Sequence, residues 1–259
     1  MVDSESLRHS RHALLNGFDE DGVAIVQNAR ALVIGAGGLG CPAATYLVSS
    51  GIQTLHWVDG DTVDATNLAR QPLFSPQDIG MSKVVCGTKA LQHIHPNCSI
   101  IASNVYADES LLDESVPLAD VVLDCTDQWA TRQMINASCV RHNVPLISAA
   151  AIEWTGQLLS INPHNAMHAC YACLFDPAHE PAAHACGAYG VLSPMVGAMG
   201  CLQAAEALKM LLIRAGHLDA AATPQMLSIL DMKSGRWQQL SVTKNPDCPV
   251  CAGRALTAR

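Results

Sequence analysis

The chain has 259 residues, of which 49% are hydrophobic and only 15% are charged. This length and apolar content suit one large α/β domain whose sheet is covered on both faces. A formal net charge of −8 argues against nucleic acid or an anionic membrane as a partner. The polar N-terminus lacks the apolar segment of a signal peptide, so we expect a cytoplasmic protein with reduced cysteines.

The segment ALVIGAGGLG, at residues 31–40, joins an apolar run to a Gly-x-Gly-x-x-Gly pattern. The apolar run predicts a buried parallel strand, and residues 42–50 predict the helix that follows. A glycine turn between a strand and a helix directs backbone N–H groups at a phosphate, which predicts a nucleotide site. Glycines needed only for a tight turn would give the same pattern. The glycines concerned are Gly35, Gly37, Gly38 and Gly40.

Up to residue 150, segments typical of strands alternate with segments typical of helices. The predicted strands are residues 31–34, 54–58, 99–104, 119–124 and 145–150. Besides two short helices within residues 5–28, the predicted helices are residues 42–50, 81–94 and 128–142. This alternation predicts a doubly wound, Rossmann-like and mostly parallel sheet.

Beyond residue 150 the pattern changes. The strands of a C-terminal antiparallel extension are predicted at residues 157–161, 225–230 and 236–242. The apolar stretch 191–213 carries three polar residues near one helical face, which predicts a buried or interface helix rather than a membrane span. Residues 162–190 have no clear period and predict a mobile loop, with the crossover at about 174–190. No linker divides the chain, so we expect a single domain over residues 1–259.

Polar residues gather where the second strand ends and in the connection that follows it. Asp59 occupies the position from which a carboxylate accepts hydrogen bonds from ribose hydroxyls, although a strand-end Asp also caps its own turn. Asp61 is expected on the same face. The connection places an amide and a guanidinium at the sheet edge where ligands of doubly wound folds bind, and the residues concerned are Asn67, Arg70 and Gln71.

Lys83 lies at the start of the predicted helix 81–94, where the helix dipole disfavours a cation. A bound anion such as a polyphosphate would relieve this misfit. Together with Arg70, Lys83 would neutralise a triphosphate or a departing pyrophosphate. Taken singly, either side chain is more typical of an ordinary solvated surface.

Asp127 follows the apolar strand 119–124 and precedes the helix 128–142. A carboxylate at the lip of the sheet, beside a phosphate-binding loop, is well placed to hold Mg²⁺. The alternative is that Asp127 only caps the helix. The two roles are compatible, and we favour the metal role.

Two Cys-x-x-Cys pairs lie far apart in the chain. Each pair can bind one metal ion from a turn, and two pairs complete a tetrahedral Zn²⁺ site. The four ligands are Cys170, Cys173, Cys248 and Cys251. Four protein ligands leave no open coordination position, so we expect this zinc to be structural. Cys186 lies in the predicted mobile loop next to histidines, and is either a thiolate nucleophile or an ordinary loop cysteine.

Several longer motifs span nearly the whole chain. They are RHSR (8–11), GAGGLGCPAA (35–44), VDGDTVDATNLARQ (58–71), IGMSK (79–83), LDCTDQWATRQMINASC (123–139), both Cys-x-x-Cys pairs, and GVLSPMVGAMGCLQAAEALKML (190–211). In this order they resemble the MoeB/ThiF/HesA family, the bacterial relatives of the ubiquitin-activating enzymes.

The resemblance implies an enzyme that uses MgATP to adenylylate the C-terminal glycine of a small β-grasp sulfur-carrier protein of the MoaD or ThiS kind. By match of motif, the glycine turn contacts the phosphates and Asp59 binds the ribose. Asp127 organises Mg²⁺ and the reacting carboxylate, and Arg11 reaches the ATP site of a partner subunit, which implies a homodimer. The residues that hold the polyphosphate are Asn67, Arg70 and Lys83.

The resemblance also bears on sulfur transfer. In ThiF-like members a cysteine at the Cys186 position can link covalently to the carrier, whereas MoeB-like members do not need one for adenylylation, so both roles stay open. No rhodanese-like domain follows Cys251, and we therefore expect the sulfur donor to be a separate protein. The activated carrier would serve molybdopterin biosynthesis, thiamine biosynthesis, or both.

The chain departs from the motifs NLQRQ, CTDN and RYxRQ that are usual in the family. Ala69 and Gln128 replace a Gln and an Asn, and His9 and His12 occur in the N-terminal motif, but no charge assigned to catalysis is lost. One alternative function is an NAD-dependent oxidoreductase built on the same glycine turn, which leaves the other charged residues and the cysteine pairs unexplained. Another is a zinc-stabilised scaffold that binds a carrier without chemistry.

Overall fold

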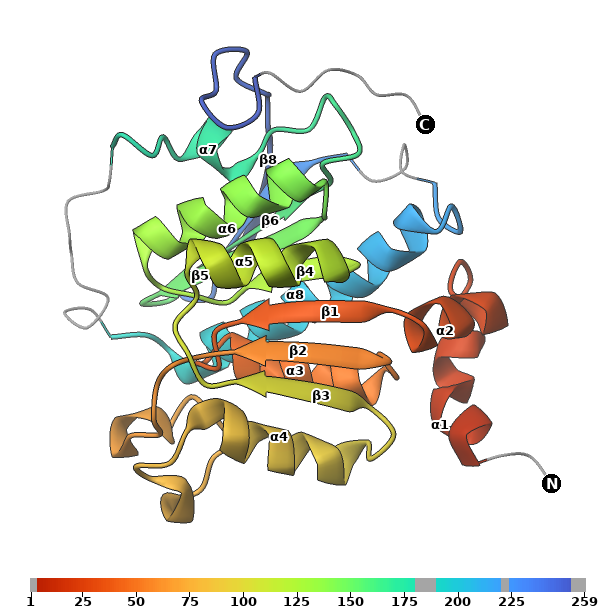
Figure 1. The fold of residues 1–259 in the computed structure, drawn as a ribbon. Helices are drawn as coiled ribbons and strands as arrows, with labels where there is room; N and C mark the ends of the chain where they lie inside the picture. The colour runs from red at the N-terminus through yellow and green to blue at the C-terminus, as the bar shows by residue number, and fades with distance from the viewer. Residues whose placement is uncertain (1–3, 180–189, 220–223, 253–259) are drawn as a thin grey trace.

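The computed structural model describes residues 4–179, 190–219 and 224–252. Its centre is an eight-stranded sheet with the order β3-β2-β1-β4-β5-β6-β7-β8 (Figure 1). The first five strands of this order are parallel, and the last three pair antiparallel. The strands are β1 Arg30–Ile34, β2 Thr54–Val58, β3 Ser99–Ser103, β4 Val121–Asp124, β5 Leu146–Ile152, β6 Thr155–Ile161, β7 Met226–Asp231 and β8 Arg236–Ser241. The predicted doubly wound sheet with an antiparallel extension is confirmed.

Helices cover both faces of the parallel half of the sheet (Figure 1). Helices α3 and α8 pack together on one face, while α5 and α6 lie on the other. The helices are α1 Ser4–Ala13, α2 Asp19–Gln27, α3 Gly40–Ser49, α4 Lys83–Ile94, α5 Glu109–Ser115, α6 Trp129–His142, α7 Tyr171–Leu174 and α8 Ser193–Arg214. The short 3₁₀ turns are η1 Ala65–Asn67, η2 Pro76–Asp78 and η3 Val116–Leu118.

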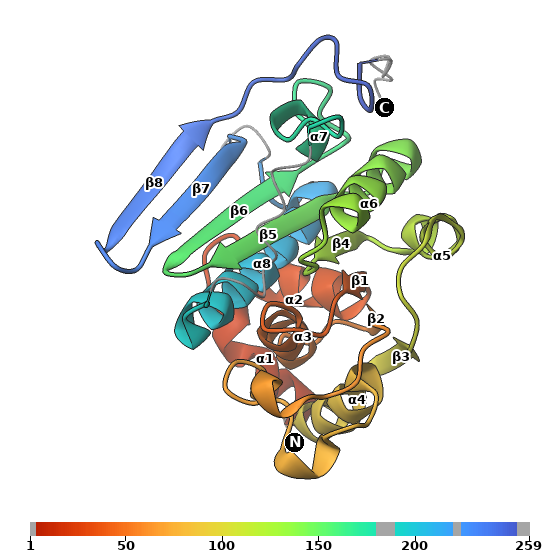
Figure 2. The ribbon, with the colours of Figure 1, turned by 90° about the vertical axis from the view of Figure 1, so that its left-hand side faces the viewer.

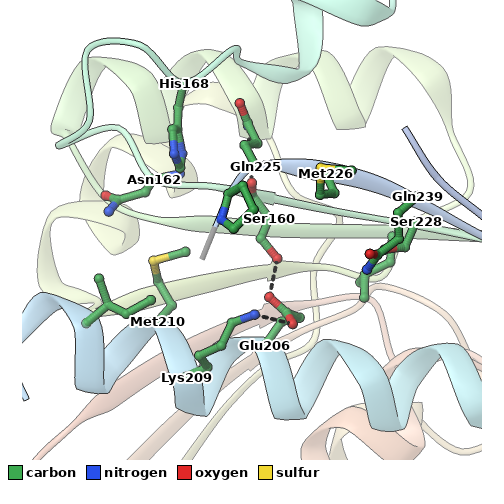
Figure 3. A pocket seen from close by; sticks show the side chains of 13 residues that line it. Ser160, Asn162, His168, Glu206, Lys209, Met210, Gln225, Met226, Ser228 and Gln239 are labelled. Carbon is green, nitrogen blue, oxygen red and sulfur yellow. Dashed lines mark hydrogen bonds and ion pairs between the residues drawn. The ribbon is translucent and has the colours of Figure 1, made fainter. Parts of the chain in front are cut away.

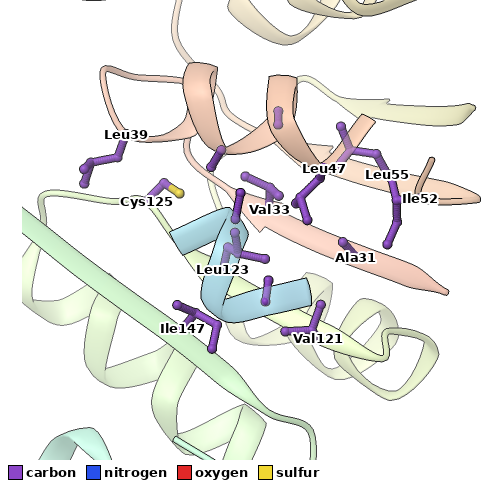
Figure 4. Packing of buried hydrophobic residues seen from close by; sticks show 14 of the residues in the cluster. Ala31, Val33, Leu39, Leu47, Ile52, Leu55, Val121, Leu123, Cys125 and Ile147 are labelled. Atoms are coloured by element: carbon purple, nitrogen blue, oxygen red, sulfur yellow. The ribbon is translucent and has the colours of Figure 1, made fainter. Parts of the chain in front are cut away.

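Strand β1 shows how the sequence builds these layers. Successive side chains of a strand point to opposite faces, so Ala31 and Val33 join the cluster under α3 and α8, and Leu32 and Ile34 join the cluster under α5 and α6. Figure 4 shows Ala31 and Val33 within the first of these clusters. Burying one Val, Leu or Ile contributes about 1.5–3 kcal/mol, which explains why β1 is apolar on both faces.

Helix α8 is the long apolar helix that the sequence predicts. By length and composition alone its 22 residues could cross a membrane, but half of its most apolar window is buried in the structure. It packs against α3, β4, β5 and β6, and its Gln203 is fully buried. Beyond it, β7 and β8 extend past the helices, and β8 is exposed along its length (Figure 2). Helix α8 is therefore a core helix that also borders the antiparallel extension.

The sequence analysis does not predict α5 or α7. Both are short, with seven and four residues, so neither is long enough to show a helical period. Helix α5 begins after Asp108, whose carboxylate accepts the Leu111 N–H at 2.8 Å. Helix α7 lies within residues 162–190, so the prediction of a loop is wrong for that part. Residues 180–189 lie outside the described residues, so the mobility of the crossover loop and the single-domain assignment stay predictions.

Histidines fill the contact between α1 and the rest of the fold. The His9 ring lies 6.4 Å from that of His12 and 6.0 Å from that of His95, centroid to centroid. His9 and His95 are only 3% and 4% exposed. Burial lowers the pKa of His12, and a charge on His9 would lower that pKa further. The contact therefore favours a neutral His12.

This arrangement predicts a loss of stability in acid. Below pH about 6.5 the unfolded chain takes up a proton on His12 that the folded chain resists, so the free energy of unfolding falls with pH by up to about 1.4 kcal/mol per pH unit for one such group. We expect His12→Gln to reduce the slope of melting temperature against pH between pH 7 and 5.5. His93→Gln, at an exposed position of α4, is the control. Equal slopes for all three proteins would contradict this role of His12.

Candidate active site

The carboxyl ends of β1, β2 and β4 meet at one edge of the sheet. After β1 the chain passes through the glycine turn and α3 to β2 on one side, whereas β4 pairs with β1 on the other. In doubly wound folds, ligands bind outside the strand ends at such a reversal of strand order. The predicted residues Asp59, Asp61 and Asp127 all lie at this edge, next to the glycine turn.

Two glycines of the turn are required by packing within the protein. Gly35 has φ +104°, and a side chain there would come 2.6 Å from the Cys125 carbonyl oxygen. A side chain on Gly40 would collide with the Gly35 carbonyl oxygen. Gly37 differs, because its nearest neighbour would be the Gln71 amide at 3.8 Å, an ordinary contact. Tight-turn sterics explain Gly35 and Gly40 but leave the turn open at Gly37, where a ligand can approach.

Asp59 supports the glycine turn from the end of β2. Its Oδ2 accepts the Ala36 N–H at 2.6 Å, and its Oδ1 accepts the Asp61 N–H at 2.7 Å. The turn-capping alternative is therefore what the structure shows. A carboxylate has about four acceptor sites, so capacity for ribose hydroxyls remains.

Lys83 is the first residue of α4 and is only 6% exposed. Its Nζ lies 2.8 Å from Asp61 Oδ2, and the Tyr106 hydroxyl donates to Asp61 Oδ1 at 2.8 Å. Burial alone would raise the pKa of Asp61, but the hydrogen bonds from Lys83 and Tyr106 outweigh it and lower that pKa. The ammonium group donates up to three hydrogen bonds, so the ion pair leaves donors for phosphate oxygens. The solvated-surface alternative is wrong for Lys83.

The connection from η1 to Gln71 is locally ordered by its own polar groups. Asn67 is buried, and its Oδ1 accepts the Asp64 N–H at 3.1 Å, which leaves the side-chain NH₂ as a donor. Arg70 is half-buried and donates from Nη1 to the Thr66 carbonyl oxygen at 2.8 Å. Both residues present N–H groups at the edge where the sequence predicts an anion.

Gln71 carries an unsatisfied polar atom beside the glycine turn. The residue is 2% exposed, and its Oε1 has no hydrogen-bond partner among the described residues. A buried amide oxygen without a partner costs free energy, so a bound donor would stabilise it. Gly38 faces α8 and the same connection, with Val196 and the Arg70 carbonyl oxygen 2.9 and 3.4 Å from a side chain placed there. Because Gly38 is crowded by these neighbours and Gly37 is not, a ligand can approach the turn at Gly37 rather than at Gly38.

The two carboxylates after β4 have different environments. Asp127 is exposed and lies one residue before Gln128, which occupies the N-cap position of α6. Asp124 is 1% exposed and accepts hydrogen bonds from Ser148 at 2.8 Å and Thr126 at 2.7 Å. Asp124 therefore holds the loop, whereas Asp127 faces solvent at its end.

The sequence analysis misses a buried network beneath this loop. Arg132 is 8% exposed, donates to the carbonyl oxygens of Thr126 and Ala149, and lies 3.8 Å from Asp124 Oδ2. Gln203 of α8 donates to the Asp124 carbonyl oxygen at 2.8 Å. Gln203, one of the three polar residues of the apolar stretch 191–213, is the sequence signal of this network. Its bonds anchor the loop after β4 from both faces of the sheet.

The four cysteines of the two Cys-x-x-Cys pairs converge. The Sγ atoms of Cys170 and Cys248 are 3.6 Å apart, those of Cys173 and Cys251 are 3.4 Å apart, and all four lie within 4.8 Å of one another. A tetrahedral zinc with bonds of about 2.3 Å places its sulfurs about 3.8 Å apart, which agrees with this cluster. Asn136 Nδ2 donates to Cys170 Sγ at 3.6 Å, a hydrogen bond that orients this sulfur within the cluster. The cluster could hold zinc, as predicted.

Of the residues predicted for the nucleotide site, Arg11 is not brought to this edge. Arg11 is exposed on α1, which lies beyond the amino ends of the strands, at the opposite end of the sheet from the glycine turn (Figure 1). Cys186 lies outside the described residues. The structure thus gathers most of the predicted nucleotide site at one edge of the sheet and places Arg11 at the opposite end.

A separate hollow lies between α8 and strands β6, β7 and β8 (Figure 3). Glu206 accepts a hydrogen bond from Ser160 at 2.8 Å and pairs with Lys209 at 2.5 Å. None of the residues found to line it belongs to the predicted nucleotide site. On the polar face of α8, Glu206 and Lys209 therefore pair with each other, and Glu206 also bonds to Ser160 of β6.

Comparisons with known proteins agree with this geometry. The chain is 41% identical over 254 residues to the sulfur carrier protein ThiS adenylyltransferase of Escherichia coli (strain K12), covering 98% of both chains. It is 39% identical over 251 residues to the molybdopterin-synthase adenylyltransferase of the same organism, covering 97% of this chain and 98% of that one. A crystal structure of E. coli MccB with succinimide has a TM-score of 0.79 at 22% identity, over 97% of this chain and 75% of that chain, which shows a shared fold.

The strand order and the residues at the glycine turn define a nucleotide-binding protein of the doubly wound class. More particularly, residues 9–250 match the ThiF family, and the chain belongs to this family. The family prediction made from the sequence is confirmed.

Proposed function

We propose that this protein uses ATP to adenylylate the C-terminal glycine of a small β-grasp sulfur-carrier protein of the ThiS or MoaD kind. The observation that carries the proposal is the open side of the glycine turn, with Asp59, Gln71 and Lys83 around it. Relatives matched over nearly their full length are named adenylyltransferases rather than dehydrogenases, which supports the same chemistry here. The activated carrier would supply sulfur in thiamine or molybdopterin biosynthesis.

The side chains at the turn suit this reaction. The carrier carboxylate attacks the α-phosphorus of ATP, and pyrophosphate leaves with the bonding electron pair. Lys83 and Arg70 oppose the charge that builds on the leaving group. Asn67 donates to a phosphate oxygen through its free NH₂, and Asp59 accepts from the ribose with its remaining lone pairs.

We assign Mg²⁺ to Asp127. An exposed carboxylate at the lip of the sheet suits an ion that prefers oxygen ligands and keeps several waters and phosphate oxygens. When bound, Mg²⁺ would offset the phosphate charge. The network of Asp124 and Arg132 anchors the loop that carries Asp127, so this carboxylate is held in place for both the ion and the carrier.

We further propose that the cysteine cluster binds one structural zinc. All four ligand positions come from the protein, and the ion would join α7 to the segment 248–251 near the C-terminus. Such a site needs reduced thiols, which supports a cytoplasmic location.

The proposed function is tested by ATP–pyrophosphate exchange. The protein, MgATP and labelled pyrophosphate are incubated with each β-grasp carrier of the source organism in turn. We expect label to enter ATP only with a carrier that retains its C-terminal glycine. No exchange with any carrier would contradict adenylylation, and exchange without a carrier would contradict the assigned substrate.

We propose that the active unit is a homodimer in which Arg11 serves the partner's site, because α1 lies at the far end of its own sheet. Arg11→Ala and Asp127→Ala should each be inactive alone. After subunit exchange, heterodimers regain one complete site, so the mixture should reach about one quarter of the wild-type exchange rate. A mixture as inactive as its parents would show that Arg11 does not act across subunits.

Cys186 is proposed as the residue that links covalently to the carrier during sulfur transfer. Its thiol would take up sulfane sulfur from the donor as a persulfide, and the persulfide would attack the acyl-adenylate, forming an acyl disulfide and releasing AMP. We expect a protein–carrier adduct that reductant cleaves, seen by mass spectrometry and absent in Cys186→Ser. Cys201→Ser, in α8, is the control. If Cys186→Ser supports full sulfur transfer with a sulfur donor added as a separate protein, this residue is an ordinary loop cysteine.

A further inference from the structure

The loop after β3 brings a tyrosine to the site that no step of the proposed reaction uses. Tyr106 follows Ser103, which pairs with Val58 at the end of β2. A side chain on Gly60 would come 2.8 Å from the Tyr106 ring carbons, so the ring lies against the backbone between Asp59 and Asp61. The missing side chain at Gly60 makes room for this ring.

Tyr106 and Lys83 hold Asp61 from two sides. The Tyr106 hydroxyl donates to Oδ1 at 2.8 Å, and Lys83 Nζ donates to Oδ2 at 2.8 Å. The Asp61 carbonyl oxygen also accepts the Lys83 backbone N–H at 3.1 Å. The Lys83 side chain is 7% exposed, whereas that of Asp61 is 49% exposed. A half-exposed carboxylate bound through one oxygen can still turn about its side-chain torsions, and the bond from Tyr106 removes that freedom.

We propose that Tyr106 is a positioning residue: by holding the carboxylate of Asp61, it directs the ammonium group of Lys83 toward the phosphates of the nucleotide. This inference rests on the proposed ATP-dependent function. A ring that served the core would be buried, but Tyr106 is 67% exposed. The hydrogen bond to Asp61 raises the pKa of Tyr106, so the phenol keeps its proton and stays a donor at neutral pH.

The first test removes only the hydroxyl. We expect Tyr106→Phe to bind ATP about three- to tenfold more weakly in calorimetric titrations of the full-length protein without carrier, as suits the loss of one partly exposed hydrogen bond to a charged group. The KM for ATP in pyrophosphate exchange should rise by the same factor, with the KM for the carrier unchanged. Tyr46→Phe, at an exposed tyrosine of α3, is the matched control and should behave as wild type.

A second test asks whether Tyr106 acts through Asp61. In an Asp61→Asn background the Tyr106→Phe change should add less than twofold, because the charged acceptor is already gone. Loss of the hydroxyl donor also raises the pKa of Asp61, so ATP affinity should begin to fall at a higher pH in Tyr106→Phe than in wild type.

The outcomes separate this inference from the proposed function. A wild type that binds ATP but shows no carrier-dependent exchange defeats the carrier assignment alone. Full exchange with equal ATP affinity in Tyr106→Phe defeats the positioning role alone, as does a full, additive effect in the Asp61→Asn background. A wild type that does not bind ATP overturns both.

Discussion

Asp127→Ala should reduce carrier-dependent pyrophosphate exchange by about 10²–10³-fold, the size of effect expected when one preorganised group at a developing charge is lost. Asp127 is exposed at the end of the loop after β4, so truncating its side chain leaves no cavity in the core. The melting temperature should therefore stay within a degree or two of wild type. Exchange at more than one tenth of the wild-type rate would contradict the role of Asp127.

Two further variants serve as controls for this result, one for activity and one for stability. Glu109→Ala removes another exposed carboxylate, in the first turn of α5, and should leave exchange unchanged. Asp124→Ala breaks the buried pair with Arg132 and leaves Ser148 and Thr126 without their acceptor. Breaking such a pair costs about 3–5 kcal/mol, so this variant should lose stability first. Activity loss with intact stability is thus the signature of Asp127 alone.

Removal of zinc should destabilise the fold. A ligand present at about 1,000 times its Kd adds about 4 kcal/mol, and in a chain of this size 1 kcal/mol shifts the melting temperature by about 2–4 °C. Stripping the metal with a chelator should therefore lower the melting temperature by about 10 °C, with zinc content measured by plasma mass spectrometry falling from one per chain to zero. Exchange per folded molecule should change little, since a closed Cys₄ site offers no position to substrate.

Single substitutions locate the ligands. Cys248→Ser and Cys173→Ser should each lose the metal and most of the added stability. Cys201→Ser, half-buried like Cys173 but outside the cluster, should keep one zinc per chain. A full zinc content in Cys248→Ser would show that the metal, if bound, is held elsewhere.

The sequence alone determined the architecture, because local patterns encode it. Apolar runs that alternate with helices allow few arrangements other than a doubly wound sheet. The apolar run at residues 31–34, for example, predicts β1 correctly before any neighbouring strand is considered. The spacing of the two cysteine pairs likewise predicts the cluster that could hold one metal ion. Short elements such as α5 and α7 are not predicted, because caps and neighbouring segments rather than a hydrophobic period determine them.

Which polar groups are paired with one another depends on the tertiary structure. Sequence spacing gives no sign that Lys83 is buried against Asp61, or that Tyr106 comes from a different strand end to complete that pair. Nor does it distinguish Asp124, which holds the loop after β4, from Asp127, which faces solvent. Burial and hydrogen-bond geometry depend on contacts between distant segments, and these exist only once the strands have paired. The glycine turn could be predicted, but the arrangement of charges around it required the fold.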